Sequence, residues 1–374
     1  MGDYNYMYFA TYIIDVAALF YLIVLLYSST TLNARRKKPF LIAIILTLII
    51  ILSEVFTILF DNGIINLRSI NILCNVLGFA LAPMIPIAIT LIFDMDILKH
   101  RKYLLVPTLV NMVAVVLSPI YRFIFYVDAR NLYTRGDYFF LFVIVYMINL
   151  LILVFLTLEI GLKNNYAITG KMVFLSFFTI LGTSIQVIHP YAYTSWHCVT
   201  LSLFLYFLLI SEFDSSFDTL TNLYNRAAFD KAVKNIEETE AFSLIVLDIN
   251  DFKVINDTYG HDYGDSAIKQ VAAVIRKSFS KQYICYRIGG DEFYIIGNGT
   301  TKEDIEYHLR IMTNSLTELR ENGNIIPTVA YGYSIFSGGE KGDFNKMLKE
   351  ADDQMYYYKK IHKTNVTQKT TDIT

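Results

Sequence analysis

The sequence predicts two parts of different fold class: an all-α bundle of transmembrane helices, followed by an α/β domain. Hydrophobic residues make up 54% of the 374 positions and charged residues only 18%, and the mean hydropathy is +0.42. That composition is too apolar for an ordinary soluble protein. Apolar runs long enough to span a bilayer recur as far as residue 211. After residue 218, β-favouring segments alternate with amphipathic helices, which is typical of an α/β fold.

The apolar runs predict about seven membrane spans in residues 1–211. We expect them at 8–28, 40–60, 70–93, 103–121, 138–162, 171–188 and 194–211. The segments between them differ in basic residues. The odd-numbered segments carry Arg35, Arg36, Lys37 and Lys38, then Lys99, Arg101 and Lys102, then Lys163 and Lys171. Since basic loops remain cytoplasmic, we expect the N-terminus outside the cell and the α/β domain in the cytosol.

Several polar side chains fall within the apolar runs. They are Asp15, Glu54, Asn111, Asn149 and Glu159. An ionisable residue at this depth points to a functional site. The alternative is that Glu54 and Glu159 form interhelical hydrogen bonds that hold the bundle together. We favour this alternative.

Charge and cysteine content exclude other classes of protein. The net charge is -2, so no basic field favours nucleic acid as a partner. The three cysteines, Cys74, Cys198 and Cys285, lie far apart and have no metal-type spacing. No cleavable signal peptide is expected, because the first apolar run is long and no basic segment precedes it.

A short linker, residues 212–217, is expected between the two parts. Polar residues break the apolar run there, and no long heptad repeat follows. Thr221 or Asn222 is expected to cap a helix that begins near Asn225. The α/β domain is expected to cover residues 218–366, with residues 367–374 as a polar tail.

The α/β domain is organised around a predicted hairpin. β-Favouring residues at 283–286 and 293–296 flank Gly289 and Gly290. Two glycines at the tip let a ligand approach the backbone closely. Asp291 and Glu292 follow directly and would point to opposite faces. A divalent cation that carries phosphate oxygens would stabilise such acids beside apolar strands, although a solvated hairpin tip is the simpler alternative.

Asp248 adds a second acid, at the end of the predicted strand Phe242–Leu247. An acid at the carboxyl end of a strand in an open α/β sheet lies where ligands usually bind. Together with Asp291, which lies 43 positions further along, it would supply the paired carboxylates that two-metal phosphoryl or nucleotidyl transfer needs.

Four further residues have side chains suited to a nucleotide. Asn256 and Asp265 carry the donor and acceptor groups that can read a purine edge. Lys359 and Lys363 lie four apart on the last predicted helix, and therefore on one face. They would hold phosphates, or they would form a solvated helix end.

Residues 218 to about 365 resemble a GGDEF domain, the catalytic module of diguanylate cyclases. Four ordered blocks carry the resemblance: Asp218–Arg226, Asp248–Asp265, Gly289–Phe293 and Ala351–Lys359. The resemblance implies a sheet flanked by helices, related to polymerase palms and class III nucleotidyl cyclases. It implies condensation of two GTP into cyclic di-GMP and two pyrophosphates, by a homodimer whose two domains face each other. It also implies a bacterial cell, whose inner membrane the N-terminal part would cross.

The resemblance assigns metal binding and catalysis to four positions. Asp248, Asp291 and the backbone carbonyl of Ile249 would hold Mg²⁺ or Mn²⁺, two ions for each GTP site. Glu292 would assist metal binding or deprotonate the attacking 3′-hydroxyl.

The resemblance also assigns the substrate contacts. Asn256 and Asp265 would bind guanine. The remaining residues would hold the triphosphate or leave room for the nucleotide: Asp251 and Phe252 through backbone N–H groups, Lys359 and Lys363 through their charge, and Gly289 and Gly290 through their small size.

Three departures from the family pattern matter. Tyr331 and Tyr333 stand where smaller aliphatic residues are common, which we interpret as packing. The family's product-inhibition site is an Arg-x-x-Asp just before the hairpin, and Ser280 and Tyr283 stand at those positions here. We therefore expect no inhibitory site of that kind. In the last block, His362 stands where the family usually has glycine, and Thr364 stands where it usually has asparagine. Lys363, which lies between them, keeps its positive charge.

The leading hypothesis is a membrane-bound diguanylate cyclase regulated by its transmembrane region, with a small extracellular or membrane ligand as a further partner. One alternative is a catalytically inactive GTP receptor, but intact Asp248, Asp291 and Glu292 argue against it. Another is a transporter or ligand-binding membrane protein with an accessory GGDEF domain. The few intramembrane charges and the short joint favour a sensor over a transporter.

Overall fold

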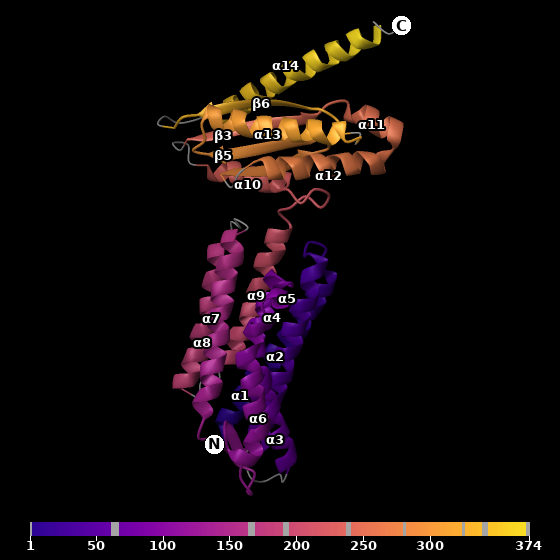
Figure 1. The fold of residues 1–374 in the computed structure, drawn as a ribbon. Coiled ribbons are helices and arrows are strands. Elements are labelled where there is room, and N and C mark those ends of the chain that lie inside the picture. The colour runs from indigo at the N-terminus through magenta and orange to yellow at the C-terminus, as the bar shows by residue number, and fades with distance from the viewer. Residues whose placement is uncertain are drawn as a thin grey trace. The chain divides into compact units, whose positions relative to one another are not determined.

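The chain forms two compact units, Met1–Asp214 and Ser215–Thr374. The computed structural model describes residues 2–60, 67–163, 169–189, 194–236, 241–279, 282–323, 326–338 and 343–371. The first unit is helical and the second is a sheet flanked by helices (Figure 1). Each unit has its own hydrophobic core. This is the fold class that the sequence predicts.

The helices of the first unit follow the apolar runs of the sequence. They are α1 Gly2–Ser28, α2 Ala34–Phe60, α3 Arg68–Leu81, α4 Met84–Phe93, α5 Ile97–His100, η1 Lys102–Leu105, α6 Val106–Tyr121, α7 Phe139–Lys163, α8 Thr169–Ile188 and α9 Thr194–Asp214. Two short strands, β1 Phe125–Val127 and β2 Tyr133–Arg135, pair antiparallel between α6 and α7.

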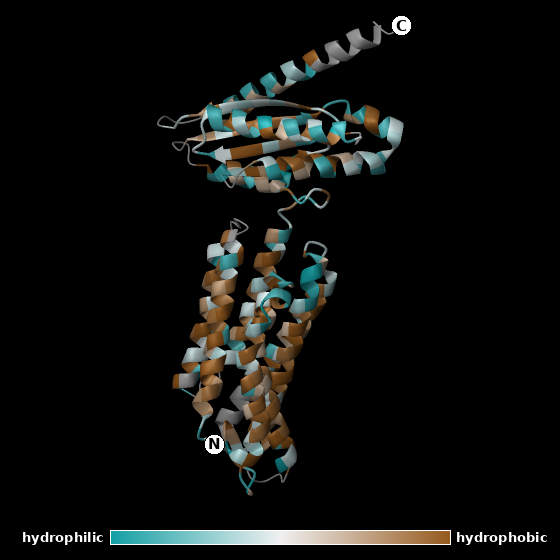
Figure 2. Ribbon diagram, in the orientation of Figure 1, coloured by the Kyte–Doolittle hydropathy of each residue, from teal (hydrophilic) through white to brown (hydrophobic). Residues whose placement is uncertain are grey.

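Six helical segments in the described parts of the chain are long and apolar enough to cross a membrane. They are Phe9–Ser28, Ala34–Phe60, Arg68–Phe93, Lys102–Tyr121, Phe139–Leu162 and Thr194–Asp214. Hydrophobic residues predominate along them (Figure 2). The remaining predicted span, 171–188, is helical as part of α8 but is not among the six. The number of spans therefore stays a prediction.

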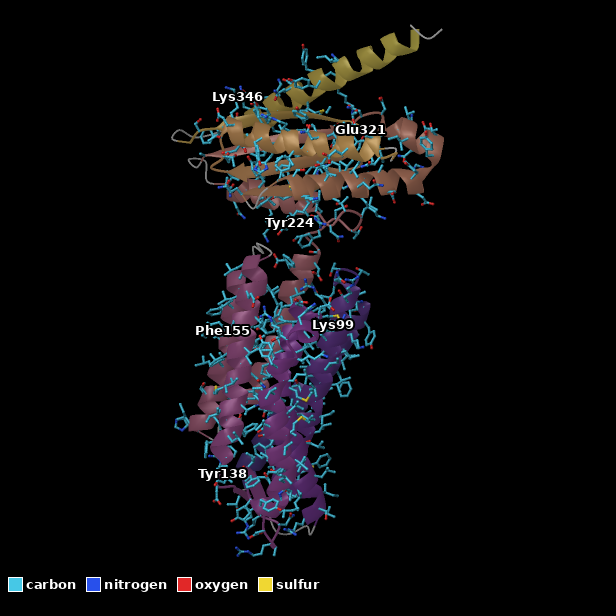
Figure 3. The ribbon with its side chains drawn as sticks, viewed as in Figure 1. Lys99, Tyr138, Phe155, Tyr224, Glu321 and Lys346 are labelled. Atoms are coloured by element: carbon cyan, nitrogen blue, oxygen red, sulfur yellow. The ribbon has the colours of Figure 1, made fainter. Side chains whose placement is uncertain are left out.

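Large apolar side chains cover the outer surface of these helices. On α7, Ile144, Leu151 and Phe155 are exposed, with Phe155 at 68% (Figure 3), whereas Leu150 and Leu153 on the same helix are buried. An apolar surface of this extent would promote association in water but can face lipid in a bilayer.

Most polar residues within the apolar runs have partners on other helices. Asn149 Nδ2 donates to the carbonyl of Pro83 at 2.7 Å, at the break between α3 and α4, and to Thr108 Oγ1 at 2.8 Å. Asn111 Nδ2 donates to the carbonyl of Phe79 at 2.9 Å. Glu159 of α7 pairs with Arg101 at 2.5 Å, and Arg101 lies in the connection between α5 and η1 rather than on a helix.

The second unit follows the predicted alternation of helices and strands. Its elements are α10 Arg226–Asn235, β3 Phe242–Ile249, α11 Phe252–Tyr259, α12 His261–Ser278, β4 Tyr283–Gly289, β5 Glu292–Asn298, α13 Lys302–Glu321, β6 Val329–Phe336 and α14 Phe344–Thr371. The four strands form one antiparallel sheet in the order β4-β5-β3-β6.

Helices cover both faces of this sheet (Figure 1). Successive side chains of a strand point to opposite faces, so Ile245 and Leu247 of β3 pack towards α12 and α13. Leu244 packs with residues of α10 and α14, and Val246 with residues of α14. All eight residues of β3 are therefore buried, which fixes the central strand firmly in the domain.

The position of Asp248 has a different cause from the one we predicted. We applied the rule for the carboxyl ends of parallel strands, but β3 is antiparallel to both of its neighbours. Asp248 lies where β3 nears its end, opposite Glu292 at the start of β5 and Ala330 near the start of β6. The pairing of antiparallel strands alone brings these acids together.

Candidate active site

The acidic residues gather where β3 ends and β5 begins. Asp248 is directly opposite Glu292 in the register of the two strands. The backbone N–H of Ile249 donates to the carbonyl of Asp291 at 3.2 Å. Asp248 is only 6% exposed, whereas Glu292 is exposed. The cross-strand partner of Asp248 is therefore Glu292, and Asp291 lies in the turn just before it.

Glu292 has a strongly negative environment. Partial burial raises the pKa of its carboxyl, and the nearby charges of Asp248, Asp291 and Asp352 raise this pKa further, while Lys359 lowers it. Asp352 lies on α14, and it was not among the predicted site residues. Three carboxylates around a fourth make a site that attracts cations.

Lys359 supplies one cation to this site. Its Nζ lies 2.5 Å from Asp248 Oδ1, and both side chains are largely buried. We predicted a phosphate contact for Lys359. That contact stays a prediction. The ammonium group balances the charge of Asp248, and a buried carboxylate needs such a partner.

The donor atoms at this site suit a hard divalent cation. Asp248, Asp291, Glu292 and the carbonyl of Ile249 offer only oxygen, which Mg²⁺ prefers. Burial raises the pKa of Glu292, and the neighbouring acids raise it further. Within the described residues, no three His, Cys, Asp or Glu side chains converge into a metal-binding group. The predicted metal ligands are neighbours in the two paired strands, although their side chains do not converge on one point. Lys359 lies beside Asp248.

Arg287 holds the tip of the hairpin. Its guanidinium donates to the carbonyl of Gly290 from Nε at 3.1 Å and from Nη2 at 2.8 Å. Gly290 has a φ of +47° and follows an irregularity in the pairing of β4 with β5. A φ of this sign favours glycine. An added Cβ at Gly289 or Gly290 would meet no atom within 4 Å, so the space beside the tip is open.

The same arginine ties the hairpin to the start of the domain. Arg287 Nη1 lies 3.0 Å from Asp218 Oδ1, and Asp218 also accepts hydrogen bonds from the backbone and hydroxyl of Thr221. Burial alone would raise the pKa of Asp218, but Thr221 and Arg287 hold this pKa below its usual value. Sequence reasoning missed this contact. Both ends are visible in the sequence, but their pairing across 69 positions is not.

The cap of α10 differs from the prediction. Asn225 Oδ1 accepts a hydrogen bond from the backbone N–H of Ala228 at 3.0 Å and caps the helix. Thr221 instead donates to Asp218 at 2.6 Å, and Asn222 has a φ of +57° within the turn. The expectation that Thr221 or Asn222 caps this helix was wrong, because the turn that contacts Arg287 uses those residues.

The two predicted guanine-binding residues lie on neighbouring helices. Asn256 is half-buried on α11, and its Oδ1 has no hydrogen-bond partner among the described residues. This oxygen lies so close to Gly264 of α12 that an added Cβ there would overlap it. Asp265 follows Gly264 and is exposed. An unpaired amide oxygen beside a carboxylate offers acceptors for the N–H groups of a base.

The remaining predicted residues are only partly described. Asp251 has a φ of +53° and directly precedes α11, whose first residue is Phe252. The side chains of Lys363, His362 and Thr364 lie outside the described residues.

Ser280, one of the two positions expected to lack the inhibitory site, also lies outside the described residues. Tyr283, the other, is 6% exposed. Its ring packs edge-on against Phe279 at 5.2 Å and His308 at 5.1 Å. Tyr283 is therefore a core residue.

Comparison with known proteins places this fold and its motifs in a family. Residues 215–365 match the family model described as "Diguanylate cyclase, GGDEF domain". This segment is a GGDEF domain. Diguanylate cyclase VdcA of Vibrio cholerae is 29% identical over 158 residues, which are 41% of this chain and 47% of that protein. Diguanylate cyclase DgcS of Shewanella oneidensis is 42% identical over 88 residues, 22% of this chain and 30% of that protein.

Other relatives of the GGDEF domain are named as membrane proteins. An uncharacterized membrane protein of Staphylococcus epidermidis is 24% identical over 229 residues, 57% of this chain and 59% of that protein. Among solved structures, the GGDEF domain of DgcB from Caulobacter crescentus in complex with c-di-GMP is 30% identical, with a TM-score of 0.34 over 39% of this chain and 91% of that chain. The chain spans about half the length, or less, of the curated relatives named here.

Proposed function

We propose that this chain is a membrane-bound diguanylate cyclase, which condenses two GTP into cyclic di-GMP and two pyrophosphates under the control of its N-terminal helices. The observation that carries the proposal is the cluster at the end of β3: Asp248 faces Glu292, and the charges of Asp291 and Asp352 lie close enough to raise the pKa of Glu292. Relatives of the GGDEF domain named as diguanylate cyclases support it.

Asp248, Asp291, Glu292 and the carbonyl of Ile249 would hold Mg²⁺ or Mn²⁺, two ions for each GTP. When bound, these ions supply positive charge that activates the 3′-oxygen and stabilises the leaving pyrophosphate. The raised pKa of Glu292 makes its carboxylate a better proton acceptor, so Glu292 takes the proton of the attacking 3′-hydroxyl. Lys359, whose ammonium group lies beside Asp248, would contact the phosphates of the nucleotide.

The substrate is held by groups from several elements. Asn256 and Asp265 accept hydrogen bonds from the N–H groups of guanine. Backbone N–H groups at Asp251 and Phe252, together with Lys359 and Lys363, hold the triphosphate, while Gly289 and Gly290 leave room for the nucleotide. Each domain binds one GTP, so the enzyme acts as a homodimer.

The membrane arrangement completes the proposal. Residues 1–211 form a multi-span sensor in the bacterial inner membrane, 212–217 a linker, 218–366 the cyclase domain and 367–374 a polar tail. The basic residues of the alternate connecting segments support an N-terminus outside the cell and a cytoplasmic cyclase domain.

The test uses the full chain in lipid nanodiscs, supplied with GTP and Mg²⁺. We expect cyclic di-GMP and two equivalents of pyrophosphate, detected by mass spectrometry and a pyrophosphate assay. The Asp291→Asn variant is the matched control, because it keeps the size of the side chain. Production of cyclic di-GMP no greater than that of this variant would overturn the proposal. GTP binding without turnover would favour the receptor alternative.

A further inference from the structure

The first unit contains a cavity of about 610 Å³. It lies among α2, α3, α7, α8, α9 and the strand β2, and all of its lining residues belong to the first unit. A cavity of this size is in the range that holds a small organic molecule. The residues that line it come from the later parts of α2 and α8 and the beginning of α9. The connecting segments at this end carry Arg68, Arg122, Arg130 and Arg135, fewer basic residues than the segments at the opposite end.

Aromatic rings form much of the cavity wall. They belong to Phe79, Tyr133, Phe139, Phe142, Tyr146 and Trp196. Phe79 organises several of them: Phe142 meets it edge-on at 5.0 Å, and Tyr133 stacks on it at 6.2 Å. Aromatic faces bind apolar groups, and they also attract cations through the negative charge of their π-systems.

A carboxyl group lies in this aromatic wall. Glu54 of α2 is half-buried and accepts a hydrogen bond from Trp196 Nε1. The side chains of Tyr12 and Gln186 also lie close to Glu54, and Gln186 Oε1 accepts from the backbone N–H of Ser195 at 2.8 Å. Polar groups of other helices therefore surround Glu54, and Trp196 donates to it directly.

Glu54 lacks a cationic partner at this position. In the described part of the chain, no lysine or arginine lies within ion-pair distance of it. His197 interacts electrostatically with Glu54, but its ring nitrogen pairs with Asp15. Arg135 is the one basic residue that lines the cavity, and its guanidinium lies 4.5 Å from the ring centre of Phe139. An acid in an apolar region without a cation is unstable as a charged group.

A second polar group that lines the cavity, the hydroxyl of Tyr146, also lacks a partner among the described residues. Tyr146 is 4% exposed, and its hydroxyl has no partner within hydrogen-bond geometry among the described residues, although the Thr183 side chain lies near it. Both Tyr146 and Thr183 line the cavity. A buried hydroxyl without a partner is rare in folded proteins, so an additional donor or acceptor inside the cavity would complete it.

We infer that this cavity binds a small amphipathic amine, whose protonated nitrogen pairs with Glu54 and whose apolar body lies against the aromatic wall. The amine supplies the positive charge that Glu54 lacks, and Trp196 and Tyr146 provide aromatic faces beside it. This assignment gives Glu54 a role beyond the interhelical contact that its sequence position suggests. It also names the chemical class of the signal that the proposed cyclase would sense.

The sequence provides an internal probe of this site, because Trp196 is the only tryptophan in the chain. Its fluorescence therefore reports on the cavity alone. The full chain, in nanodiscs of phosphatidylcholine, is titrated with phenylbutylamine, phenylbutanol and phenylbutyrate. These molecules share an apolar body and differ only in a cationic, neutral or anionic end. We expect a saturable change in Trp196 fluorescence with the amine at a concentration about tenfold below that needed for the alcohol.

Two variants test the two parts of the site. Glu54→Gln keeps the hydrogen-bonding shape and removes the charge, so affinity for the amine should fall by about tenfold or more and approach that for the alcohol. Gly78→Leu fills the cavity. Gly78 lines it and an added Cβ there would meet no atom within 4 Å, while leucine favours the helix more than glycine does. This variant should fold and lose the response to all three molecules.

Glu159→Gln is the matched control. Glu159 is another acid of the first unit, pairs with Arg101 and does not line the cavity, so amine affinity should be unchanged. Equal affinity for amine and alcohol in the wild type would overturn the inference, as would undiminished amine binding in Glu54→Gln or in Gly78→Leu. The fluorescence readout requires no cyclase activity, so failure of this inference and failure of the proposed function are distinguishable.

Discussion

At the scale of single residues, the Lys359–Asp248 ion pair is the most informative contact of the candidate active site. It places an ammonium group 2.5 Å from an acid that we expect to hold metal. A monovalent side chain can therefore stabilise Asp248 when no metal is present. No ion pair of the neighbouring Glu292 is found among the described residues, and burial together with three nearby acids raises the pKa of its carboxyl, while Lys359 lowers it. The two facing acids thus differ in environment, as a metal ligand and a proton acceptor should.

Asp291→Asn should lower cyclic di-GMP synthesis by on the order of a hundredfold or more, because losing one preorganised charge at a reacting centre has effects of that size. Its backbone carbonyl, which accepts from Ile249 N–H, is kept, so the fold should persist. Product formation by the full chain and circular dichroism measure the two effects. Full activity of Asp291→Asn with normal Mg²⁺ dependence would contradict the assignment of the site.

Glu292→Gln should change how stability depends on pH. Burial and neighbouring acids raise the pKa of Glu292 in the folded state. The stability that Glu292 contributes to the wild type is therefore fully present at pH values below the usual glutamate pKa. It is lost as the pH rises through the pKa of Glu292 in the folded state. The glutamine variant cannot ionise. Without metal, its β3 and β5 amides should exchange more slowly than those of the wild type at neutral pH, and equally at acidic pH. Faster exchange in the variant at neutral pH would refute this electrostatic picture.

At the scale of secondary-structure elements, the contact between α11 and α12 positions the proposed base-binding residues. Asn256 and Gly264 lie so close that no side chain fits at position 264 without displacing the amide. Glycine is therefore required at position 264 because the side chain of Asn256 approaches α12 closely there. The backbone conformation does not require it, since α12 is regular at that position. Asp265 lies beside this contact, and the spacing of the two helices thus sets the geometry of both predicted guanine contacts.

Gly264→Ala should weaken GTP binding by about tenfold while leaving the domain folded, because Asn256 must move away from the added methyl group. The same change in an Asn256→Ala background should have little further effect, since the clashing oxygen is gone. A double-mutant cycle of GTP affinities measures this coupling. If the two changes weaken GTP binding independently and additively, Gly264 does not act through Asn256.

The inhibitory site that we do not expect in this chain would include the positions of Ser280 and Tyr283. Tyr283, the first residue of β4, lies in the core against Phe279 and His308, so its side chain is not available to a cyclic dinucleotide at the surface. We expect cyclic di-GMP to lower the rate of the full chain only by competing with GTP. Kinetics at several GTP concentrations test this. Loss of rate that excess GTP does not reverse, with tight binding of product, would identify another inhibitory surface.

The elements of this domain could be predicted from sequence more completely than the contacts between them. Periodicity located the hairpin before and after Gly290 and the buried strand that ends near Asp248, because local propensity and burial act together there. It did not give the antiparallel order β4-β5-β3-β6. Nor did it give the pairs that Arg287 and Lys359 form across 69 and 111 positions. Such contacts depend on strand register and helix placement, which no local pattern encodes.

In the first unit, too, the helices could be predicted from sequence, but the contacts between residues far apart in the chain could not. The apolar runs predicted its helices, and Glu54 of α2 accepts a hydrogen bond from Trp196 of α9, an interhelical contact of the expected kind. The cavity could not be predicted, since its wall combines residues of five helices and one strand. Glu54 and Trp196 are separated by 142 positions. Only the packed helices bring them together.

At the scale of the whole molecule, the proposed reaction requires two chains. The chain contains one GGDEF match, at residues 215–365, and one described pair of facing acids, Asp248 and Glu292. One such site would bind one GTP, whereas cyclic di-GMP contains two guanylyl units. Each 3′-hydroxyl must therefore reach the α-phosphate of the nucleotide on the other domain. A chain held apart from its partner would bind substrate without completing the reaction.

Nanodiscs that hold one copy of the chain should therefore make at least about tenfold less cyclic di-GMP per chain than nanodiscs that hold two, because bringing two bound reactants together raises their effective concentration strongly. GTP affinity should be the same in both preparations, which controls for damage to the domain. Cross-linking the two copies should not lower the rate. Equal rates per chain in one-copy and two-copy nanodiscs would exclude a dimeric mechanism, since no second domain would then be needed to supply the other nucleotide.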